Sequence, residues 1–247
     1  MNRKQLLEQV RLEQETLAAQ NTAQSDTAFY KAYAKDRTLT RAKFDMAHKD
    51  KKTLSVGQLY TKKLIEQCDF KSSAPRSFDA NAPSAEQKKI YSALATYCKK
   101  FPDVKTPNIV LSGATGTGKT YISHILANNL LDSGFWVEYT TAFGMVNAFQ
   151  KYIASFGADD AKLDAFLECN MLVIDDLGAE PVIKNITSEH IYNIINERLV
   201  HGRAFVITTN LSPEAIFDRY DQRIASRILS KETSTIIEVK GKDLRLV

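Results

Sequence analysis

Residues 113 to 120 read Gly-Ala-Thr-Gly-Thr-Gly-Lys-Thr, the G-x-x-x-x-G-K-[ST] pattern of a phosphate-binding loop. Its glycines allow the backbone to fold around an anion, so that N–H groups and the start of the next helix face the phosphate oxygens. Lys119 is expected to reach the β- and γ-phosphates, and the Thr120 hydroxyl to ligate Mg²⁺. All residues of the loop are predicted nucleotide contacts: Gly113, Ala114, Thr115, Gly116, Thr117, Gly118, Lys119 and Thr120.

Glycine usage supports this prediction. The chain has only 10 glycines, and three of them lie in these eight residues. The first 112 residues contain a single glycine, Gly57. A glycine turn that binds nothing is therefore the weaker interpretation.

The surroundings of the loop indicate an α/β fold. Apolar runs predict strands at Ile109–Leu111, Trp136–Tyr139, Met171–Ile174 and Phe205–Thr208. Apolar residues at helical spacing predict helices at Ser84–Lys100, where Ser84 and Gln87 form a capping box, and at Thr120–Asp132, Ala142–Phe156 and Ser188–Val200. This alternation is typical of βαβ units, and it predicts a parallel sheet flanked by helices on both faces.

The N-terminal part of the chain has a different composition. Residues 1–70 contain no proline and have a helical pattern, which predicts a small all-α domain, joined by a linker at 71–77 to the nucleotide-binding domain at 78–247. Residues 1–75 carry 14 Lys and Arg against 9 Asp and Glu, although the whole chain has a net charge of only +4. The basic excess suits nucleic acid or an acidic protein surface, or it is an ordinary solvated helical face. The apolar stripes of so small a domain are completed by a partner, or by packing within the chain.

Two predicted strands end in polar side chains. The third strand is followed directly by Asp175 and Asp176, and the fourth leads to Asn210. Because ligands bind beyond the carboxyl ends of parallel strands, Asp175 is expected to hold Mg²⁺ opposite Thr120, and Asp176 to orient or deprotonate the attacking water. Asn210 either hydrogen-bonds the γ-phosphate or the water, or belongs to a simple turn.

Arg223 and Arg227 are four residues apart and therefore share a helix face. One interpretation is that they stabilise charge on the γ-phosphate of a neighbouring subunit. The other is ordinary surface pairing with Asp218 or Asp221.

Taken together, these segments resemble the AAA+ ATPases, and more narrowly the DnaC/DnaI-type helicase loaders and the related IstB transposition ATPases. The similar segments are Gly113–Thr120, Leu172–Gly178, Ile207–Leu211, the Arg-Ile-x-x-Arg-Ile pattern from Arg223, and Gly241–Arg245. The resemblance covers roughly residues 76–247, whereas the N-terminal region is similar only in size, helicity and position.

The resemblance implies ATP and Mg²⁺ as ligands, and it implies roles for the matching residues. Asp175 and Asp176 correspond to the Walker B pair, with aspartate at 176 where glutamate is common in AAA+ proteins. Asn210 corresponds to sensor 1. Phe78 is similar to the family's apolar residue near adenine, and Arg245 to a terminal arginine that approaches the nucleotide.

The resemblance also implies partners. Arg227, with Arg223 as second candidate, corresponds to an arginine finger that acts on a neighbouring subunit, so self-association is expected. The family's loaders bind the hexameric replicative helicase through the N-terminal domain, here residues 1–70, and contact single-stranded DNA. The expected function is therefore ATP-dependent loading of that helicase during replication initiation. The alternatives are an IstB-like transposition ATPase that acts on duplex DNA with a transposase, and an adaptor that binds nucleotide without hydrolysing it.

Other features narrow the class of protein. The sequence has no apolar N-terminal segment and no run of about 18 apolar residues, so a cytoplasmic protein without membrane contact is expected. The resemblance implies that the cell is bacterial or phage-infected. Its three cysteines lack C-x-x-C spacing, which indicates neither a zinc site nor a disulfide framework. Phe143, Phe149 and Tyr152 are the aromatic candidates for contacts to single-stranded DNA. Phe149 and Tyr152, which are three residues apart, either form a stacking platform or belong to the core.

Overall fold

The computed structural model describes residues 84–155, 161–183 and 187–243. The predicted helical domain at 1–70 and the linker at 71–77 lie outside these residues, as do Phe78 and Arg245. The described residues all belong to the predicted nucleotide-binding domain.

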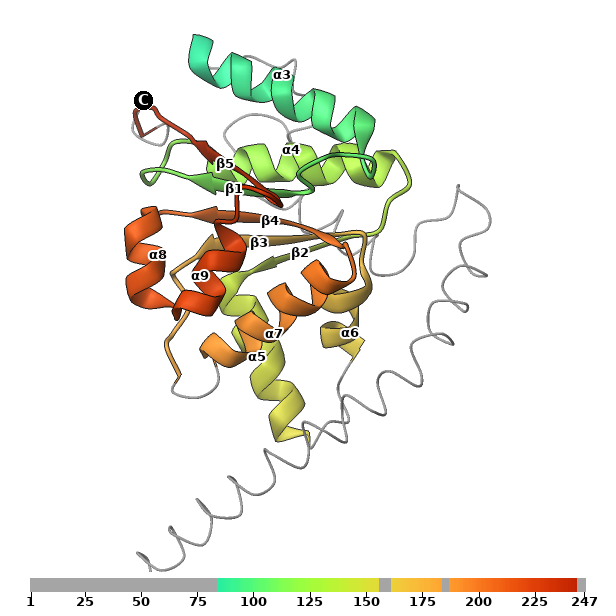
Figure 1. Cartoon of the computed structure of the whole chain (residues 1–247), viewed down its shortest axis with the longest axis vertical. Helices are drawn as coiled ribbons and strands as arrows, with labels where there is room; N and C mark the ends of the chain where they lie inside the picture. The colour runs from blue at the N-terminus through green and yellow to red at the C-terminus, as the bar shows by residue number, and fades with distance from the viewer. Residues whose placement is uncertain (1–83, 156–160, 184–186, 244–247) are drawn as a thin grey trace, which may run out of the picture. The chain divides into compact units, whose positions relative to one another are not determined.

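A parallel sheet of five strands forms the centre of this domain (Figure 1). The strands are β1 (Asn108–Ser112), β2 (Val137–Thr141), β3 (Met171–Leu177), β4 (Ala204–Thr209) and β5 (Ser234–Glu238), in the order β2-β3-β4-β1-β5. All neighbouring pairs are parallel. The parallel sheet and its four predicted strands are confirmed. The sequence did not predict β5, because only Ile236 and Ile237 are apolar among its five residues.

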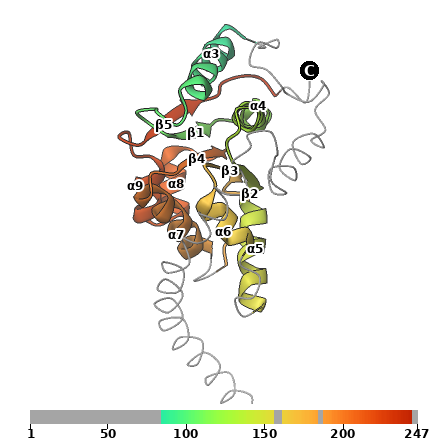
Figure 2. The same cartoon turned by 90° about the vertical axis from the view of Figure 1, so that its right-hand side faces the viewer.

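The side chains of the strands alternate between two cores. Met171 and Val173 of β3 belong to the core beneath α3 (Ala85–Lys100) and α4 (Lys119–Asp132). Leu172 and Ile174 belong to the opposite core. That face is covered by α5 (Ala142–Ala154), α6 (Ala161–Glu168), α7 (Thr187–Val200), α8 (Pro213–Arg219) and α9 (Gln222–Ile228), as Figures 1 and 2 show. The predicted arrangement of helices on both faces is confirmed, and none of the helices in the described ranges has the length and apolar character needed to span a membrane.

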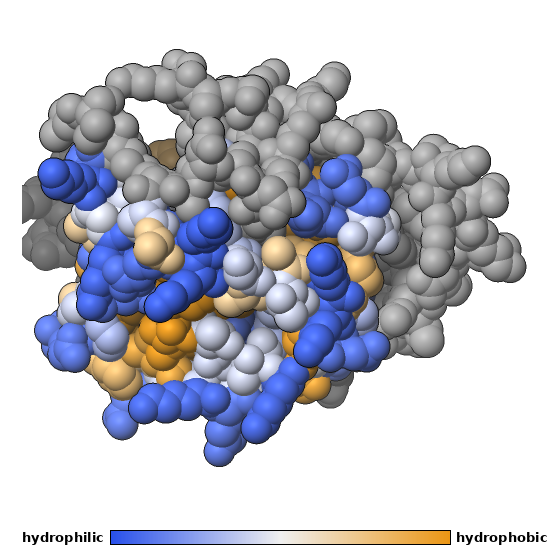
Figure 3. All heavy atoms as spheres, turned by 90° about the horizontal axis from the view of Figure 1, so that it is seen from above, coloured by the Kyte–Doolittle hydropathy of each residue, from blue (hydrophilic) through white to orange (hydrophobic). Residues whose placement is uncertain are grey.

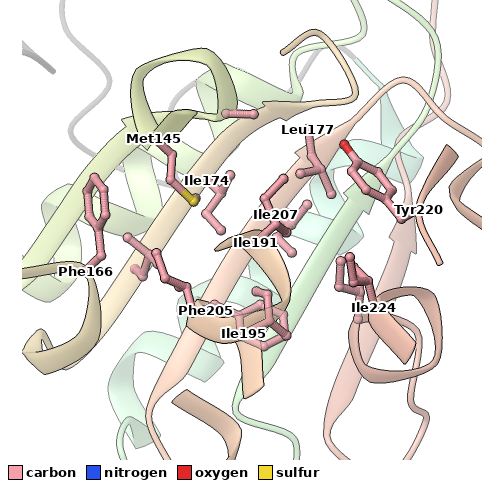
Figure 4. Packing of buried hydrophobic residues seen from close by; sticks show 14 of the residues in the cluster. Met145, Phe166, Ile174, Leu177, Ile191, Ile195, Phe205, Ile207, Tyr220 and Ile224 are labelled. Carbon is pink, nitrogen blue, oxygen red and sulfur yellow. The ribbon is translucent and has the colours of Figure 1, made fainter. Parts of the chain in front are cut away.

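The second core joins α7 firmly to the sheet. Figure 4 shows Phe205 and Ile207 of β4 next to Ile191 and Ile195 of α7. None of these four side chains is more than 1% exposed. Burial of one such side chain stabilises a fold by about 1.5–3 kcal/mol. Helix α7 is therefore a rigid support for whatever packs on its other side.

Helix α3 is linked to the phosphate-binding loop. The Ser84 hydroxyl accepts a hydrogen bond from the Gln87 N–H at 3.2 Å, which is the N-cap that the sequence predicted. The buried Gln87 side-chain amide donates to the Thr117 carbonyl at 3.0 Å, and this contact connects the helix to the loop. Seen from above, the face that carries α3 is mainly hydrophilic around smaller apolar areas (Figure 3). Exposed Lys88 and Lys89 contribute to that character.

His124 makes the stability of this domain depend on pH. The residue lies in α4 and is 1% exposed, and its ring centre lies 4.4 Å from that of Tyr139. Burial lowers the pKa of His124 from 6.5 to about 4, because the charged imidazolium loses its hydration there. In the unfolded chain the same group titrates near its ordinary value. The unfolded state therefore binds the extra proton between about pH 6.5 and pH 4, and stability falls as the pH is lowered through that window.

We expect the free energy of unfolding to be about 2 kcal/mol lower at about pH 5 than at about pH 7.5 through this residue. Urea unfolding of the wild type and of His124→Phe at the two pH values measures the effect. Phenylalanine keeps an aromatic ring against Tyr139 and cannot titrate, so the variant should lose less stability on acidification. An equal loss in both proteins would assign the pH dependence to other groups.

Candidate nucleotide-binding site

The loop between β1 and α4 has a backbone conformation that requires glycine. Gly113 has a φ of 146°, and a Cβ there would lie 2.4 Å from the carbonyl oxygen of Val239. Gly118 has a φ of 94° and occupies the N-cap of α4. Inside the loop, the Thr117 hydroxyl donates to the Ala114 carbonyl at 2.9 Å. A loop of this kind, leading into a helix N-terminus, is suited to surrounding a phosphate group.

Lys119 is the first residue of α4, and its side chain turns back over the loop. Its ammonium group donates to the carbonyl oxygens of Gly113 at 2.8 Å and of Ala114 at 2.7 Å. The residue is 7% exposed, so its positive charge is held close to the loop backbone. A phosphate oxygen is a stronger acceptor than a neutral carbonyl, and Lys119 therefore fits the predicted phosphate contact.

Asp175 lies two residues before the end of β3 and faces Thr120 of α4. One of its carboxylate oxygens, Oδ1, accepts hydrogen bonds from the Thr120 hydroxyl at 3.1 Å and the Thr208 hydroxyl at 2.6 Å. Asp175 is 7% exposed and Thr208 is 1% exposed. A threonine hydroxyl and a carboxylate at this separation are the hard oxygen ligands that Mg²⁺ prefers. The residues present thus fit the predicted metal ion.

Thr208 also belongs to this candidate site, although the sequence did not predict it. Its hydroxyl donates to Asp175 and also accepts the N–H of Asp176 at 2.8 Å, so it fixes both acidic residues from the neighbouring strand. One feature of the sequence could have identified Thr208. It is a polar residue near the end of a buried strand, and that strand was expected to lie beside the strand of Asp175.

Asp176 has an unusual backbone conformation for a residue other than glycine. Its φ is 59°, and the pairing of β3 with β4 shifts register between Ile174 and Leu177. Aspartate and asparagine tolerate this left-handed region better than other side chains. The exposed Asp176 carboxylate accepts a hydrogen bond from the Asn210 side-chain amide at 3.2 Å. The two predicted residues are thus brought together at the same edge of the sheet as Asp175.

Arg223 and Arg227 share one face of α9, as the spacing predicted, and both contact Tyr192 of α7. Their guanidinium carbons lie 4.9 Å and 4.7 Å from the centre of the Tyr192 ring. Arg223 also pairs with Asp221 at 2.7 Å, so the predicted surface pairing occurs for this residue. Arg227 instead donates to the Asn196 side-chain oxygen at 3.0 Å. Among the described residues, neither arginine has a hydrogen bond or ion pair to the phosphate-binding loop of its own chain.

Phe149 and Tyr152 do not form the stacking platform that was considered for DNA. Phe149 is 5% exposed, belongs to the second core and stacks on His190 with ring centres 4.2 Å apart. Phe143 is 53% exposed at the start of α5, and Tyr152 is half-buried. Phe149 is therefore a core residue, because the apolar face of α5 turns towards the sheet.

Replacement of Lys119 by alanine is expected to weaken ATP binding by about 10- to 100-fold, the value of a charge-assisted hydrogen bond to phosphate. Titration of a fluorescent ATP analogue into the wild type and Lys119→Ala measures the change. Lys99→Ala is a matched control, since that lysine is exposed at the end of α3. Unchanged affinity in Lys119→Ala would show that the loop is not the phosphate site.

Comparison with known proteins agrees with this geometry. The family model described as IstB-like ATP binding protein matches residues 5–247. The uncharacterized protein YdaV of Escherichia coli K12 is 25% identical over 165 residues, which are 67% of this chain and 63% of the relative. The chromosomal replication initiator DnaA of Wolinella succinogenes is 26% identical over 144 residues, which are 54% of this chain and 32% of DnaA. The chain thus matches less than two thirds of the length of either relative.

Solved structures share the fold. The DnaC helicase loader has a TM-score of 0.59 at 20% identity, and the match covers 66% of this chain and 96% of that one. DnaI has a TM-score of 0.55 at 22% identity, with 68% and 89% covered. AMPPCP-bound DnaA from Aquifex aeolicus has a TM-score of 0.59 at 17% identity, with 70% and 51% covered. The predicted AAA+ P-loop fold is therefore confirmed.

Proposed function

Since the chain belongs to the family of IstB-like ATP-binding proteins, we propose that it is a slow, switch-like ATPase that loads the hexameric replicative helicase onto single-stranded DNA. One observation supports the ATPase activity above all. Thr120, Asp175, Asp176 and Asn210 come from three different segments, yet hydrogen bonds join Thr120 to Asp175 and Asp176 to Asn210. A protein that only binds nucleotide does not need the hydrogen-bonded pair of Asp176 and Asn210.

In the proposed reaction, each residue has a separate role. Lys119 holds the β- and γ-phosphates, while Thr120 and Asp175 provide oxygen ligands for Mg²⁺, which neutralises phosphate charge when bound. Asp176 orients the attacking water and accepts its proton as the new oxygen–phosphorus bond forms and the bond to the β-phosphate oxygen breaks. Asn210 keeps the Asp176 carboxylate in place through their hydrogen bond.

A second copy of the chain completes the site in this proposal. Transition-state charge on the transferred phosphoryl group is commonly stabilised by an arginine from a neighbouring subunit. Arg227 and Arg223 are candidates because Tyr192 orders both of them on the surface and neither is bonded to its own loop. ATP binding would then favour the self-associated form, and hydrolysis would release it.

The loader function is proposed from the likeness in fold to the DnaC helicase loader, for which the match covers 96% of the chain in the solved structure. Residues 1–70 are the proposed contact to the helicase. The segment between Lys31 and Lys52 has eight Lys and Arg against three Asp, a composition that suits acidic surfaces or single-stranded DNA. The exposed Phe143 is an aromatic side chain on which a base can stack. A cytoplasmic location follows from the same proposal.

A transposition ATPase is the second candidate. It is favoured by the family description itself, since the IstB-like model matches nearly the whole sequence, including most of the N-terminal region. This candidate would act on duplex DNA together with a transposase. The two functions share the nucleotide chemistry and differ in the partner.

The deciding experiment is co-elution from a sizing column with the replicative helicase in the presence of ATP. The full-length protein is compared with a chain that starts at Arg76, whose fold is checked by circular dichroism. We expect a large complex with the full-length protein only. Failure of the full-length protein to form a complex would contradict the loader function, and binding to duplex DNA would then be tested for the transposition ATPase.

A further inference from the structure

Glu180 is a buried acidic residue just beyond the proposed catalytic strand. It lies in the loop that follows β3, and only 2% of the residue is exposed. A carboxylate is costly to bury unless charged or hydrogen-bonding groups surround it. The groups around Glu180 therefore indicate what this residue holds together.

Both carboxylate oxygens of Glu180 are used. Oε2 accepts the N–H of Gly178 at 2.8 Å, within the same loop. Oε1 accepts the Tyr220 hydroxyl at 2.5 Å and the Arg219 guanidinium at 3.2 Å and 3.3 Å. Arg219 also donates to the main-chain carbonyl of Glu180 at 2.5 Å. One side chain thus connects the end of β3 to two residues some 40 positions further along the chain.

The loop end of this connection leads directly to the proposed catalytic residues. Gly178 is two residues beyond Asp176, and its φ of 107° suits glycine. The Leu211 side chain packs against Gly178, where a Cβ would lie 2.7 Å from Leu211 Cδ1. Leu211 in turn follows Asn210, the partner of Asp176. The loop is therefore held between the hydrolytic residues on one side and Glu180 on the other.

Arg219 and Tyr220, the other partners of Glu180, lie directly before α9, the helix that carries Arg223 and Arg227. Arg219 ends α8, Tyr220 is its C-cap, and the next residue, Asp221, is the N-cap of α9. Asp221 accepts the Ile224 N–H at 3.1 Å and pairs with Arg223 at 2.7 Å. Figure 4 shows Tyr220 beside Leu177 at the end of β3, and both belong to the same core. Burial first, and the hydrogen bond to Glu180 second, raise the pKa of Tyr220, so the phenol stays protonated as the donor.

We propose that Glu180 is a positioning residue for the arginine finger. It fixes the start of α9 to the loop after β3. The position in which each subunit presents Arg223 and Arg227 to its neighbour is therefore set by β3 of the same subunit. This inference rests on the proposed function, in which hydrolysis needs an arginine from a second copy. Glu180 itself is not expected to touch the nucleotide.

The test uses the full-length chain and the variant Glu180→Gln, which keeps the size of the side chain and removes its charge. We expect its ATP hydrolysis to fall at least tenfold, as for a partly misplaced arginine finger. Affinity for a fluorescent ATP analogue should be unchanged, because the change displaces Arg223 and Arg227, which act in the site of the neighbouring subunit. Wild-type hydrolysis by Glu180→Gln would overturn the proposal.

Mixed assemblies separate positioning from a merely structural role. Asp176→Asn subunits cannot complete hydrolysis in their own site, yet they carry intact Glu180 and intact arginines. Mixed with Glu180→Gln subunits, whose catalytic residues are intact, they should restore hydrolysis several-fold above the sum of the separate proteins. A structural defect in Glu180→Gln would not be repaired by a neighbour, so the absence of restoration would overturn the proposal.

A benchmark mixture distinguishes failure of this inference from failure of the proposed function. Subunits with both Arg223→Ala and Arg227→Ala are mixed with Asp176→Asn subunits, and restored hydrolysis is expected. If the benchmark is restored but the Glu180→Gln mixture is not, Glu180 does not position the arginines. If the benchmark is not restored either, no arginine acts between subunits and both proposals fall. Tyr220→Phe, which removes only one hydroxyl, repeats the test should Glu180→Gln fail to fold.

Discussion

Replacement of Asp176 by asparagine is expected to lower the rate of ATP hydrolysis by about 10²- to 10⁴-fold, the contribution typical of a general base. ATP affinity should be unchanged, because the phosphate contacts are assigned to the loop and to Lys119. Asparagine cannot accept a proton from water, yet its side-chain oxygen can still accept the hydrogen bond from Asn210. The variant therefore removes the proposed chemistry and keeps the local contacts.

The backbone conformation at residue 176 accepts asparagine without additional strain. Asp176 has a φ of 59°, a conformation that asparagine adopts about as readily as aspartate. Phosphate release under saturating ATP and titration with a fluorescent ATP analogue give the two quantities. If Asp176→Asn hydrolysed ATP at more than one tenth of the wild-type rate, Asp176 would not be the general base. The matched control is Asp132→Asn, at the far end of α4 from the loop.

The same φ offers a physical reason for aspartate where AAA+ proteins commonly carry glutamate. A longer side chain in the left-handed region costs roughly 1 kcal/mol or more. Asp176→Glu is thus expected to lower stability without raising the rate of hydrolysis. The register of β3 shifts between Ile174 and Leu177, the backbone is left-handed at residue 176, and a short aspartate side chain tolerates that conformation.

Much of this domain was predictable from the sequence, because its signals are local. The phosphate-binding loop is a contiguous motif, and the first four strands are short apolar runs between helices. Asp175, Asp176 and Asn210 follow from the rule that parallel strands end at one edge of the sheet. Their hydrogen bonds at that edge agree with this expectation.

What the sequence did not predict depends on contacts between distant segments. Glu180 and Tyr220 are ordinary polar residues in the sequence, and only the fold brings them together in the interior. Phe149 was open to two interpretations, since helical spacing does not say which partner covers an apolar face. Arg198 lies in the last turn of α7, where a basic residue usually faces solvent, yet it is 0% exposed.

The buried Arg198 leads to the second large prediction, which concerns stability. Its guanidinium donates to the carbonyl oxygens of five residues that end α6, precede β3 and begin β4: Phe166, Leu167, Cys169, Asn170 and Ala204. Replacement by methionine keeps a long apolar side chain and removes every donor. Buried carbonyl groups left without partners are costly, so we expect the free energy of unfolding to fall by about 3–5 kcal/mol.

Trp136 provides a direct measurement of this change. It is the only tryptophan of the chain, and its carbonyl accepts the Asn170 N–H at 2.9 Å, next to the Arg198 contacts. Urea unfolding followed by tryptophan fluorescence is therefore sensitive to this region. Lys151→Met is the matched control, because it makes a similar change at an exposed basic residue in the last turn of α5. A loss of stability in Arg198→Met no larger than that in Lys151→Met would mean that the buried guanidinium is not what holds α6 to the two strands.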